Sequence, residues 1–380
     1  MKQSYRIIPV YTGDVSGVCS ALFELGGMTV IHDPSGCNST YNTHDETRWY
    51  DSDSLIFISG LSERDALMGN DKKLIRDIVT AAKQLNPRFI TLVNSPIPYM
   101  TGTDFHAVAA LVEKETGIPV LRVATNGMHD YTKGAGDALA ALIAPCVREP
   151  KGIRPKSLNI LGVTPLDFAA AGSAASLRRA VSERGWDIVS CWAMDSSPED
   201  IEKSAEASVN LVVSSLGLAA AQELQKRFGT PYVAGPPVDG FSDLLFEALE
   251  SAEREKRCAV PYTQRSAEGE GCIHLIGDAV VMGSIAAAIT RKCGRPARVV
   301  CPLEVWKGLL GETDVHVFGE EGTEQAVQNA ESIIADPLYR PVCPANSAFF
   351  PLPHEAFSGR IFRKTMPNIA ELDVCALIGG

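Results

Sequence analysis

Several motifs that would assign the chain to a common class are missing from its 380 residues. It has no G-x-x-x-x-G-K-[ST] motif, so we do not expect this chain to bind and hydrolyse ATP at a P-loop. None of its ten cysteines forms a C-x-x-C pair, which argues against a zinc ribbon or a thioredoxin-type site. The stretch GAGDAL carries Gly134 and Gly136 but not the rest of a dinucleotide fingerprint, so nucleotide binding there is not favoured.

Long apolar runs and an excess of positive charge are also missing. No apolar stretch reaches the 18 or so residues of a membrane span, and the first residues, MKQSYRIIPVYTGD, contain no apolar core of a secretory signal. We therefore expect a cytoplasmic protein in which disulfides are unlikely to form. The net charge of −11 argues against a nucleic acid or an anionic membrane as the main partner.

What the sequence does contain is a repeated alternation of short β-branched runs and amphipathic helical stretches. This alternation predicts βαβ units and parallel sheets covered by helices. The expected strands are 54–60, 88–96, 118–125, 155–163, 186–193, 209–215, 230–235, 272–278, 297–302 and 314–319. The expected helices are 62–85, 103–117, 135–145, 170–184, 198–207, 217–228 and 322–335.

The alternation restarts after two polar seams, at 148–157 and 261–271. We therefore predict an α/β fold of three Rossmann-like subdomains. Their expected ranges are 1–152, 153–265 and 266–380. In sheets of this kind, ligands bind beyond the carboxyl ends of the strands. A cleft where the strand ends of the three subdomains converge is the expected site.

The most unusual stretch is VIHDPSGCNSTYNTHDETRWYD, at 30–51, where many polar side chains follow a predicted buried strand. Pro34 and Gly36 predict a tight turn with Cys37 at its apex. Backbone N–H groups around such a turn can lower the thiol pKa and favour a thiolate ligand. The alternative is that Cys37 is a small residue before the next helix. Cys19, about a turn into an apolar helix, can equally be a ligand or a core residue.

The second half of this stretch carries side chains that can move protons or bind anions. His44 with Asp45 could transfer protons, and Arg48 beside Trp49 could hold an anion or a partner surface. The alternative is a solvated loop. The remaining cysteines lie mostly in apolar segments, and we expect them in the core: Cys146, Cys191, Cys258, Cys272, Cys293, Cys301, Cys343 and Cys375.

Three first-subdomain segments resemble the nitrogenase component 1 family. VIHDPSGC resembles its H-G-P-x-G-C turn, SERDALMGNDKKL its E-R-D-x-x-F-G-G-x-K-K-L, and NSPIPYMTGTD its E-C-P-x-x-x-I-G-D-D. VNLVVSSLG in the second subdomain resembles its L-N-L-V segment, and the third subdomain fits more loosely. The family includes the molybdenum–iron protein subunits, their biosynthetic scaffold and nitrogenase-like tetrapyrrole reductases.

The resemblance implies an iron–sulfur cluster near a subunit interface and electrons delivered by an ATP-hydrolysing iron protein. It implies a homodimer or a heteromer with a related chain. The family's Gly-Cys cluster ligand falls on Cys37. Tyr11, Ser95 and Ser214 stand where the family has cysteines, and no histidine matches the one that completes the molybdenum cofactor site. We therefore do not expect the reduction of dinitrogen.

A [4Fe–4S] cluster needs about four ligands, and Cys37 and Cys19 from each of two chains would supply them. The resulting hypothesis is a reductase component with an unknown small-molecule substrate. Its expected proton donors are His44 and Asp45, followed by His32, His129 and Asp130. The alternatives are a metallocofactor assembly scaffold or carrier without turnover, and a metal-free paralogue within a heteromer.

Overall fold

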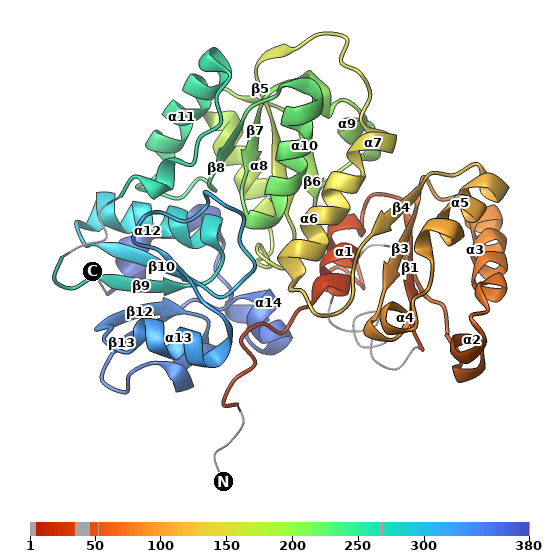
Figure 1. The fold of residues 1–380 in the computed structure, drawn as a ribbon. Coiled ribbons are helices and arrows are strands. Elements are labelled where there is room, and N and C mark those ends of the chain that lie inside the picture. The colour runs from red at the N-terminus through yellow and green to blue at the C-terminus, as the bar shows by residue number, and fades with distance from the viewer. Residues whose placement is uncertain (1–4, 35–45, 52, 266–268, 380) are drawn as a thin grey trace.

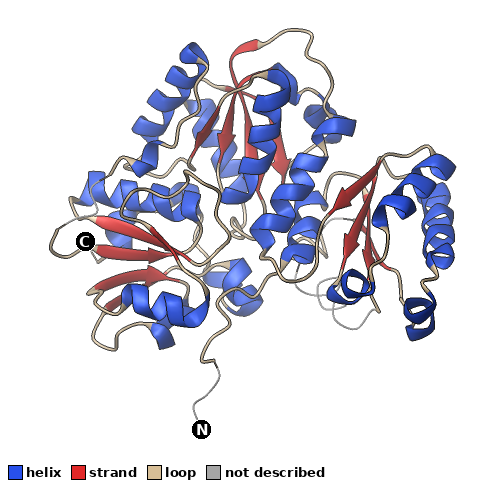
Figure 2. Ribbon diagram, viewed as in Figure 1, coloured by secondary structure: helices blue, strands red, loops and turns tan. Residues whose placement is uncertain are grey.

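The computed structural model describes residues 5–34, 46–51, 53–265 and 269–379. They form three parallel sheets, one in each third of the chain, with helices packed on both faces (Figures 1 and 2). The predicted α/β class, with parallel sheets flanked by helices, is confirmed. The subdomain boundaries at 152 and 265 stay a prediction.

The first sheet has the strand order β2-β1-β3-β4, and all its pairs are parallel. Its strands are β1 (Met28–His32), β2 (Leu55–Ile58), β3 (Ile90–Asn94) and β4 (Val120–Val123). The helices of this part are α1 (Asp14–Leu22), α2 (Glu63–Met68), α3 (Asp71–Leu85), α4 (Pro96–Thr101), α5 (Phe105–Thr116), α6 (Tyr131–Ala141) and α7 (Ile143–Cys146).

The second sheet has the parallel order β6-β5-β7-β8. Its strands are β5 (Arg154–Val163), β6 (Asp187–Ala193), β7 (Ala207–Val212) and β8 (Tyr232–Ala234). Its helices are α8 (Ser173–Glu183), α9 (Pro198–Glu202), α10 (Leu218–Phe228) and α11 (Ser242–Glu255).

The third sheet has the parallel order β11-β10-β9-β12-β13. Its strands are β9 (Ile273–Ile276), β10 (Ala297–Cys301), β11 (Val315–His316), β12 (Ser332–Ala335) and β13 (Ala348–Pro351). Its helices are α12 (Ala279–Cys293), α13 (Gly319–Val327), α14 (Glu355–Ser358) and α15 (Val374–Leu377).

Several of the expected helices differ from the structure: the one at 135–145 is α6 and α7, the one at 198–207 ends with α9 at Glu202, and two others differ more. The expected helix 62–85 is two helices, because Gly69 adopts a left-handed conformation (φ 59°) that ends α2. The expectation of one helix over 322–335 is wrong, because α13 ends at Val327 and the buried Ser332–Ala335 forms β12. Its isoleucines lie between β9 and β13, where the sheet overrides the local pattern.

Helices α1 and α6 cross at a pair of glycines. A Cβ atom at Gly134 would lie 2.0 Å from the backbone oxygen of Asp14, and one at Gly17 would lie 2.3 Å from that of Tyr131. Any side chain at either position would hold the helices apart. Gly134 therefore has a packing role.

The first described residues of the chain contact its third part. Near the N-terminus, Arg6 pairs with Glu320 and Glu324 of α13, and the Thr12 amide donates to the backbone oxygen of Ala356. These contacts join the first residues of the chain to the third sheet and its helices. A large apolar core likewise runs through all three parts, while a smaller one lies under α3 and α5 of the first sheet.

A disulfide joins Cys293, at the end of α12, to Cys375 in α15, with 6.0 Å between their Cα atoms. The expectation of core cysteines without disulfides is wrong for this pair. Both side chains are only partly buried, so they approach each other at the surface of α12 rather than in the core. Among the described residues, no helix is both long and apolar enough to span a membrane.

Candidate functional site

The carboxyl edge of the first sheet gathers polar side chains that follow buried strands. His32 ends β1, and its Nδ1 lies 2.7 Å from Ser59 Oγ. Burial lowers the pKa of His32 to about 4, so the ring is neutral near pH 7. Ser95 follows β3, and its amide donates to the backbone oxygen of His32. The Ser95 Oγ is buried and has no hydrogen-bond partner within the described part of the chain.

Cys37, His44 and Asp45 lie outside the described residues. The described part of the chain stops at Pro34, two residues after the end of β1, and resumes at Glu46. Cys37 therefore follows closely in sequence on the edge that carries His32 and Ser95. Its geometry relative to that edge is not part of what the structure describes.

Arg48 anchors the returning chain instead of presenting a free cation. Its guanidinium pairs with Glu46 at 2.8 Å and Glu24 at 2.9 Å, and it also donates to the backbone oxygen of Ser20. It further lies over the ring of Phe23, 4.7 Å from the ring centroid. These contacts fix the end of the loop onto α1 and the residues that follow it.

Cys19 is fully buried in the large apolar core. Burial raises the pKa of its thiol far above the ordinary value, and the nearby Glu46 adds to this. Such a thiol stays protonated and is shielded from solvent and from any second chain. The sequence left Cys19 as either a ligand or a core residue, and its buried position favours a core residue.

A buried acid–base cluster lies where the three parts of the chain meet. Tyr131 comes from α6, Asp167 follows β5, Asp278 caps α12, and His354 precedes α14. The Tyr131 hydroxyl donates to Asp167 Oδ1 at 2.5 Å, and His354 Nε2 lies 3.2 Å from the same oxygen. None of these four residues is more than 8% exposed. We call them the junction cluster.

The charges within the junction cluster shift its pKa values. Burial lowers the pKa of His354, but the Asp167 carboxylate and the charges of Asp336 and Asp278 outweigh it, so the net shift is upward. Burial, followed by the charge of Asp167, raises the pKa of Asp278. Burial also raises the pKa of Tyr131. The protonated form of His354 is thus favoured relative to a free histidine, while Asp278, with a pKa of about 6, is mostly ionised at pH 7.

Several buried polar atoms around the junction cluster lack a hydrogen-bond partner within the described residues. They are Asp167 Oδ2, Thr164 Oγ1, Ser215 Oγ and both ring nitrogens of His354, whose Nε2 approaches Asp167 Oδ1 to 3.2 Å without hydrogen-bond geometry. An unpaired buried polar atom costs about 1 to 3 kcal/mol, so each favours a water molecule or a ligand atom nearby. Ser214 differs, because its Oγ donates to the backbone oxygen of Gly162 at 2.8 Å.

A hollow of about 730 Å³ is bounded by all three parts of the chain, and its lining includes sequence neighbours of the junction cluster but none of the four cluster residues themselves. Pro165 and Phe168, which flank Asp167 in sequence, line it. So does Arg363, whose guanidinium pairs with Glu355, the neighbour of His354. The other walls are 47–51, 169–175, 194–195 and 360–364 in part. We call this hollow the interdomain pocket.

His129 and Asp130 serve as contacts between the first and third parts. His129 Nδ1 lies 2.6 Å from Glu304 Oε1, and the Glu304 amide donates to Asp130 Oδ2 at 2.5 Å. Asp130 also caps α6 by accepting from the Thr132 amide. The structure does not bring either residue into the junction cluster.

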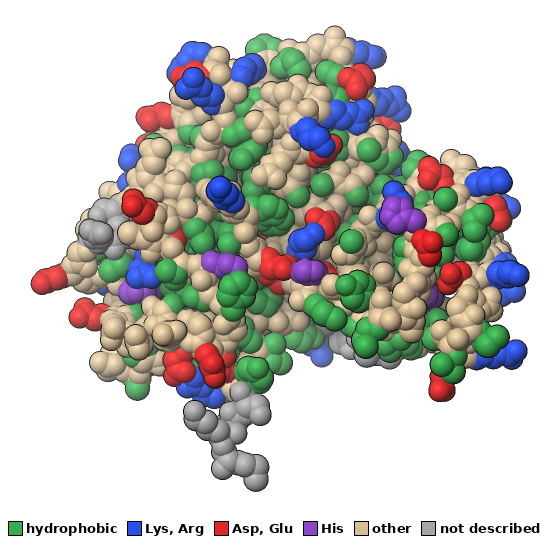
Figure 3. All heavy atoms as spheres, in the orientation of Figure 1, with side chains coloured by type: hydrophobic (Ala, Val, Ile, Leu, Met, Phe, Trp, Pro, Cys, Tyr) green, Lys and Arg blue, Asp and Glu red, His purple; other side chains and the backbone are tan. Residues whose placement is uncertain are grey.

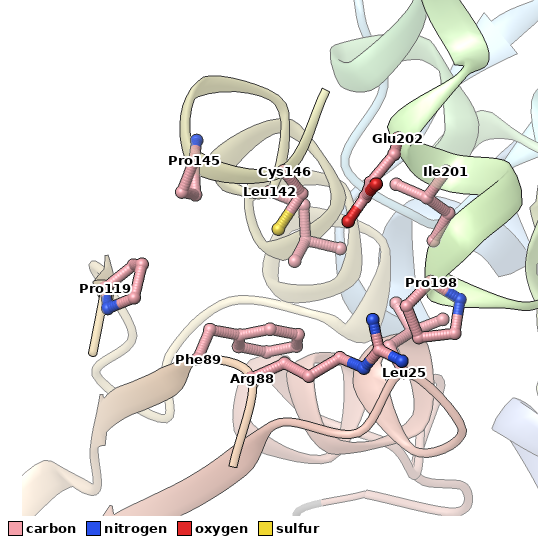
Figure 4. A pocket seen from close by; sticks show the side chains of 10 residues that line it. All are labelled: Leu25, Arg88, Phe89, Pro119, Leu142, Pro145, Cys146, Pro198, Ile201 and Glu202. Carbon is pink, nitrogen blue, oxygen red and sulfur yellow. The ribbon is translucent and has the colours of Figure 1, made fainter. Parts of the chain in front are cut away.

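A second hollow, of about 250 Å³, lies between the first and second parts (Figure 4). Phe89, Leu142 and Ile201 give it apolar walls, and the sulfur of Cys146 faces it. Burial raises the pKa of Cys146 to about 11, so its thiol is not an activated nucleophile. This hollow lacks the convergent polar groups of the interdomain pocket.

Neither a metal site nor a basic surface stands out. Within the described ranges, no three His, Cys, Asp or Glu side chains are grouped to hold a metal ion. Basic and acidic side chains are interspersed over the face drawn in Figure 3, with hydrophobic side chains between them.

Comparisons with known proteins give a consistent result. Residues 16–255 match the family model of the nitrogenase component 1 type oxidoreductases. The chain is 26% identical over 213 residues to the nitrogenase iron-molybdenum cofactor biosynthesis protein NifE of Bradyrhizobium diazoefficiens, covering 54% of this chain and 38% of that protein. It is 26% identical over 222 residues to the nitrogenase molybdenum-iron protein alpha chain of Azospirillum brasilense, covering 54% and 45%.

The NifE protein of Clostridium pasteurianum is 28% identical over 228 residues, covering 57% of this chain and 48% of that protein. The matched region thus spans about half or less of the length of these relatives. Among solved structures, one titled "Nitrogenase Cp1 at pH 6.5" aligns with a TM-score of 0.69 at 14% identity, over 100% of this chain and 93% of that chain. This last likeness concerns the fold.

Proposed function

Because the chain belongs to the nitrogenase component 1 type oxidoreductase family, we propose that it is a nitrogenase-like reductase component. It takes electrons from a separate ATP-dependent iron protein and passes them to a small molecule other than dinitrogen. The observation that carries this proposal is the buried junction cluster, whose Asp167 lies in sequence between Pro165 and Phe168, two residues that line the interdomain pocket. Reduction consumes protons together with electrons, and buried acid–base groups can supply them.

The residues of the cluster have separate roles in this proposal. His354, held protonated by Asp167, donates a proton to the bound molecule, and the hydroxyl of Tyr131 keeps the Asp167 carboxylate in place. The exposed Arg360 and Lys364 lie at the pocket wall and favour an anionic ligand. The buried Phe168 keeps bulk water from the carboxylate.

For the electron path we propose a [4Fe–4S] cluster bound through Cys37, which would supply one-electron transfer when present. Ser95 is suited to be a further ligand, since its buried Oγ is unpartnered within the described residues and lies at the same strand edge. Because Cys19 is enclosed in the core, the remaining ligands would come from a second chain. The cluster would then lie at a subunit interface.

An exposed apolar edge supports a partner chain on the first sheet. Met100 and Tyr99 of α4, with Leu67 and Met68 of α2, are between 51% and 79% exposed. Apolar groups gathered in this way commonly mark an interaction site. We propose a cytoplasmic homodimer, or a heteromer with a related component 1 chain, that covers this edge.

A second candidate function is a metallocofactor assembly scaffold or carrier without turnover. The observation that favours it is that several relatives are named as cofactor biosynthesis proteins. A scaffold would use the interdomain pocket to hold a cofactor for transfer rather than to reduce a substrate.

The two candidate functions differ in whether the protein turns over more than once. The test combines anaerobically reconstituted protein with an iron protein, ATP, dithionite and the small-molecule fraction of an anaerobic cell extract. A reductase gives sustained ATP-dependent oxidation of dithionite well beyond the protein's own cluster content. Oxidation that stops after one equivalent supports the scaffold and contradicts the reductase.

The proposed ligand is tested independently by counting iron. We expect Cys37→Ser to lose most of the iron and of the visible absorption near 400 nm. Cys343→Ser is the matched control, because its partly buried thiol already bonds to the backbone oxygen of Tyr339. Wild-type protein with far fewer than two irons per chain, or a Cys37→Ser variant with full iron, would rule out the proposed cluster.

A further inference from the structure

The end of the chain returns from the third part to the second. We call residues 359–378 the C-terminal strap. In its middle, Glu371 accepts from Arg179 and Ser176 of α8, at 2.5 and 2.7 Å, and the Asn368 side-chain amide donates to Ser176 Oγ at 2.9 Å. The strap is thus attached to a helix that lies almost 200 residues earlier in sequence.

The far end of the strap is attached to α12. The Cys293–Cys375 disulfide joins α15 covalently to the last turn of α12. Next to it, Lys292 Nζ lies 3.2 Å from Asp373 and 2.7 Å from Asp239. The C-terminus accordingly lies beside α12 in Figure 1.

The near end of the strap forms a wall of the interdomain pocket. Arg360, Arg363 and Lys364 line the pocket from the strap, and 172–175, at the start of α8, line it from the second part. Since Glu371 fastens the strap to α8 itself, the strap holds these two walls together. Its attachment to α12 limits how far they can separate.

Apart from the disulfide, the strap is held by the packing of Ile369 and Val374 into the apolar core and by ion pairs, of which those to α8 and α12 are weak. Arg179, Glu371 and Asp373 have side chains more than half exposed in their ion pairs, and exposed ion pairs contribute at most about 1 kcal/mol each. The disulfide is the one covalent attachment of the strap among the described residues. Both of its cysteines are partly exposed, so a small thiol can reach it.

We propose that the Cys293–Cys375 disulfide is a redox-sensitive clasp that controls access to the interdomain pocket. One thiol of a small dithiol reductant attacks one sulfur and releases the other cysteine as a thiol, and the second thiol of the reductant then attacks the mixed disulfide and releases the first cysteine. The dithiol is oxidised to a disulfide, and the protein gains two electrons and two protons as two Cys thiols. With the clasp open, the strap separates from α12 and the pocket walls part more often. This goes beyond the proposed reduction and does not depend on it.

Hydrogen exchange monitored by mass spectrometry tests the proposal on the full chain. Oxidised protein is compared with protein treated with dithiothreitol. We expect exchange at least ten-fold faster after reduction in three segments: 372–378, 360–366 and 172–176. The double variant with Cys293→Ser and Cys375→Ser should exchange fast in all three without reductant. Cys343→Ser, whose thiol is not in a disulfide, should keep the wild-type response.

Two results would overturn the proposal. One is a peptide map of the oxidised protein in which Cys293 and Cys375 are both alkylated as free thiols. The other is a reduced protein in which both cysteines are alkylated, while exchange in 360–366 and 172–176 stays within two-fold of the oxidised protein. Should the double variant fail to fold, the oxidised and reduced wild type still give both results.

Discussion

At the scale of single side chains, the junction cluster depends on His354 more than on any other residue. Its ring lies 3.2 Å from Asp167 and contacts Phe357, with 4.6 Å between the ring centroids. Since charge on this ring is stabilised by Asp167, Asp336 and Asp278 together, its loss removes the proton donor without removing a carboxylate. Replacing His354 therefore tests whether this ring supplies the proton.

We predict that His354→Gln lowers the turnover of reconstituted protein at least 100-fold, because general acid catalysis typically contributes 10²- to 10⁴-fold. Its iron content should stay close to that of the wild type, whereas its thermal stability should fall, because the buried Asp167 carboxylate loses a partner. His106→Gln, on the surface of α5, is the matched control. Turnover of His354→Gln within three-fold of the wild type would exclude this role.

His32 gives a prediction about stability and pH. Burial lowers its pKa to about 4 in the folded protein, while an unfolded histidine titrates near 6.5. Between these values the unfolded chain binds more protons than the folded one, so stability falls as the pH drops from 6.5 to 4. The contribution is fully present above pH 6.5 and amounts to roughly 3 kcal/mol.

Denaturant unfolding of the wild type and of His32→Gln, at several values between pH 4 and 7, checks this. Gln keeps a hydrogen-bonding group for Ser59 but does not titrate. We expect the stability of the wild type relative to the variant to increase with pH over this range. A constant difference between the two proteins would contradict the neutral, buried state of His32.

At this scale the sequence could identify strand-end residues but not the junction cluster. His32 and Ser95 follow recognisable buried strands, so their shared edge was predictable. Asp167 and His354 are 187 positions apart in the numbering and belong to no spaced motif. Their pairing arises only when the loop after β5 meets the start of α14.

His129 and Asp130 were candidate proton donors because of their residue types. In the structure, both instead contact Glu304.

At the scale of elements, the crossing of α1 and α6 is the tightest helix contact described above. The backbone of Asp14 lies where a Cβ atom of residue 134 would be, at 2.0 Å. Backbone cannot move aside as a flexible side chain can, so the two helices would have to separate. Because α6 carries Tyr131, the separation would also disturb the junction cluster.

We predict that Gly134→Ala lowers the free energy of unfolding by about 3 kcal/mol or more, the upper part of the range for overpacking. Gly152→Ala is the matched control, since no atom lies within 4 Å of its added Cβ, and it should change stability by less than about 1 kcal/mol. Equal effects of the two substitutions in denaturant titrations would contradict the close crossing.

Most helices and strands were predictable from the periodicity of apolar residues. The predictions were wrong where contacts between distant residues determine the structure. The alternation of strands and helices over the first two parts follows apolar spacing and helix-capping residues such as Ser62. The prediction of a helix reaching residue 335 was wrong, because Ser332–Ala335 forms a strand that pairs with β9 and β13. The disulfide was not predictable either, since Cys293 and Cys375 are 82 residues apart and meet only through α15.

At the scale of the whole molecule, the exposed edge formed by α2 and α4 bears on assembly. Met100 is 78% exposed, and Leu67 of the contacting helix α2 is 79% exposed. A charge placed there would be desolvated at an interface but would remain hydrated on a free surface. The effect of such a charge therefore reports whether a second chain covers the edge.

We predict that Met100→Asp weakens self-association or pairing with a related chain at least ten-fold. Analytical ultracentrifugation of anaerobic protein measures this directly. Ile153→Asp, at a 50% exposed position between the first and second sheets, should leave association unchanged. A dimer that persists in Met100→Asp, or equal weakening by both changes, would exclude this edge as the interface.

The contact between Arg6 and Glu320 has a consequence for how the protein is made. These residues are 314 positions apart, so Arg6 has no Glu320 partner until residue 320 has been synthesised. At about 5 to 20 residues per second, Arg6 waits on the order of 15 to 60 s after it is translated. During that time the N-terminal segment is accessible to proteases, chaperones and neighbouring chains. It becomes fixed only when α13 has been synthesised and pairs with Arg6.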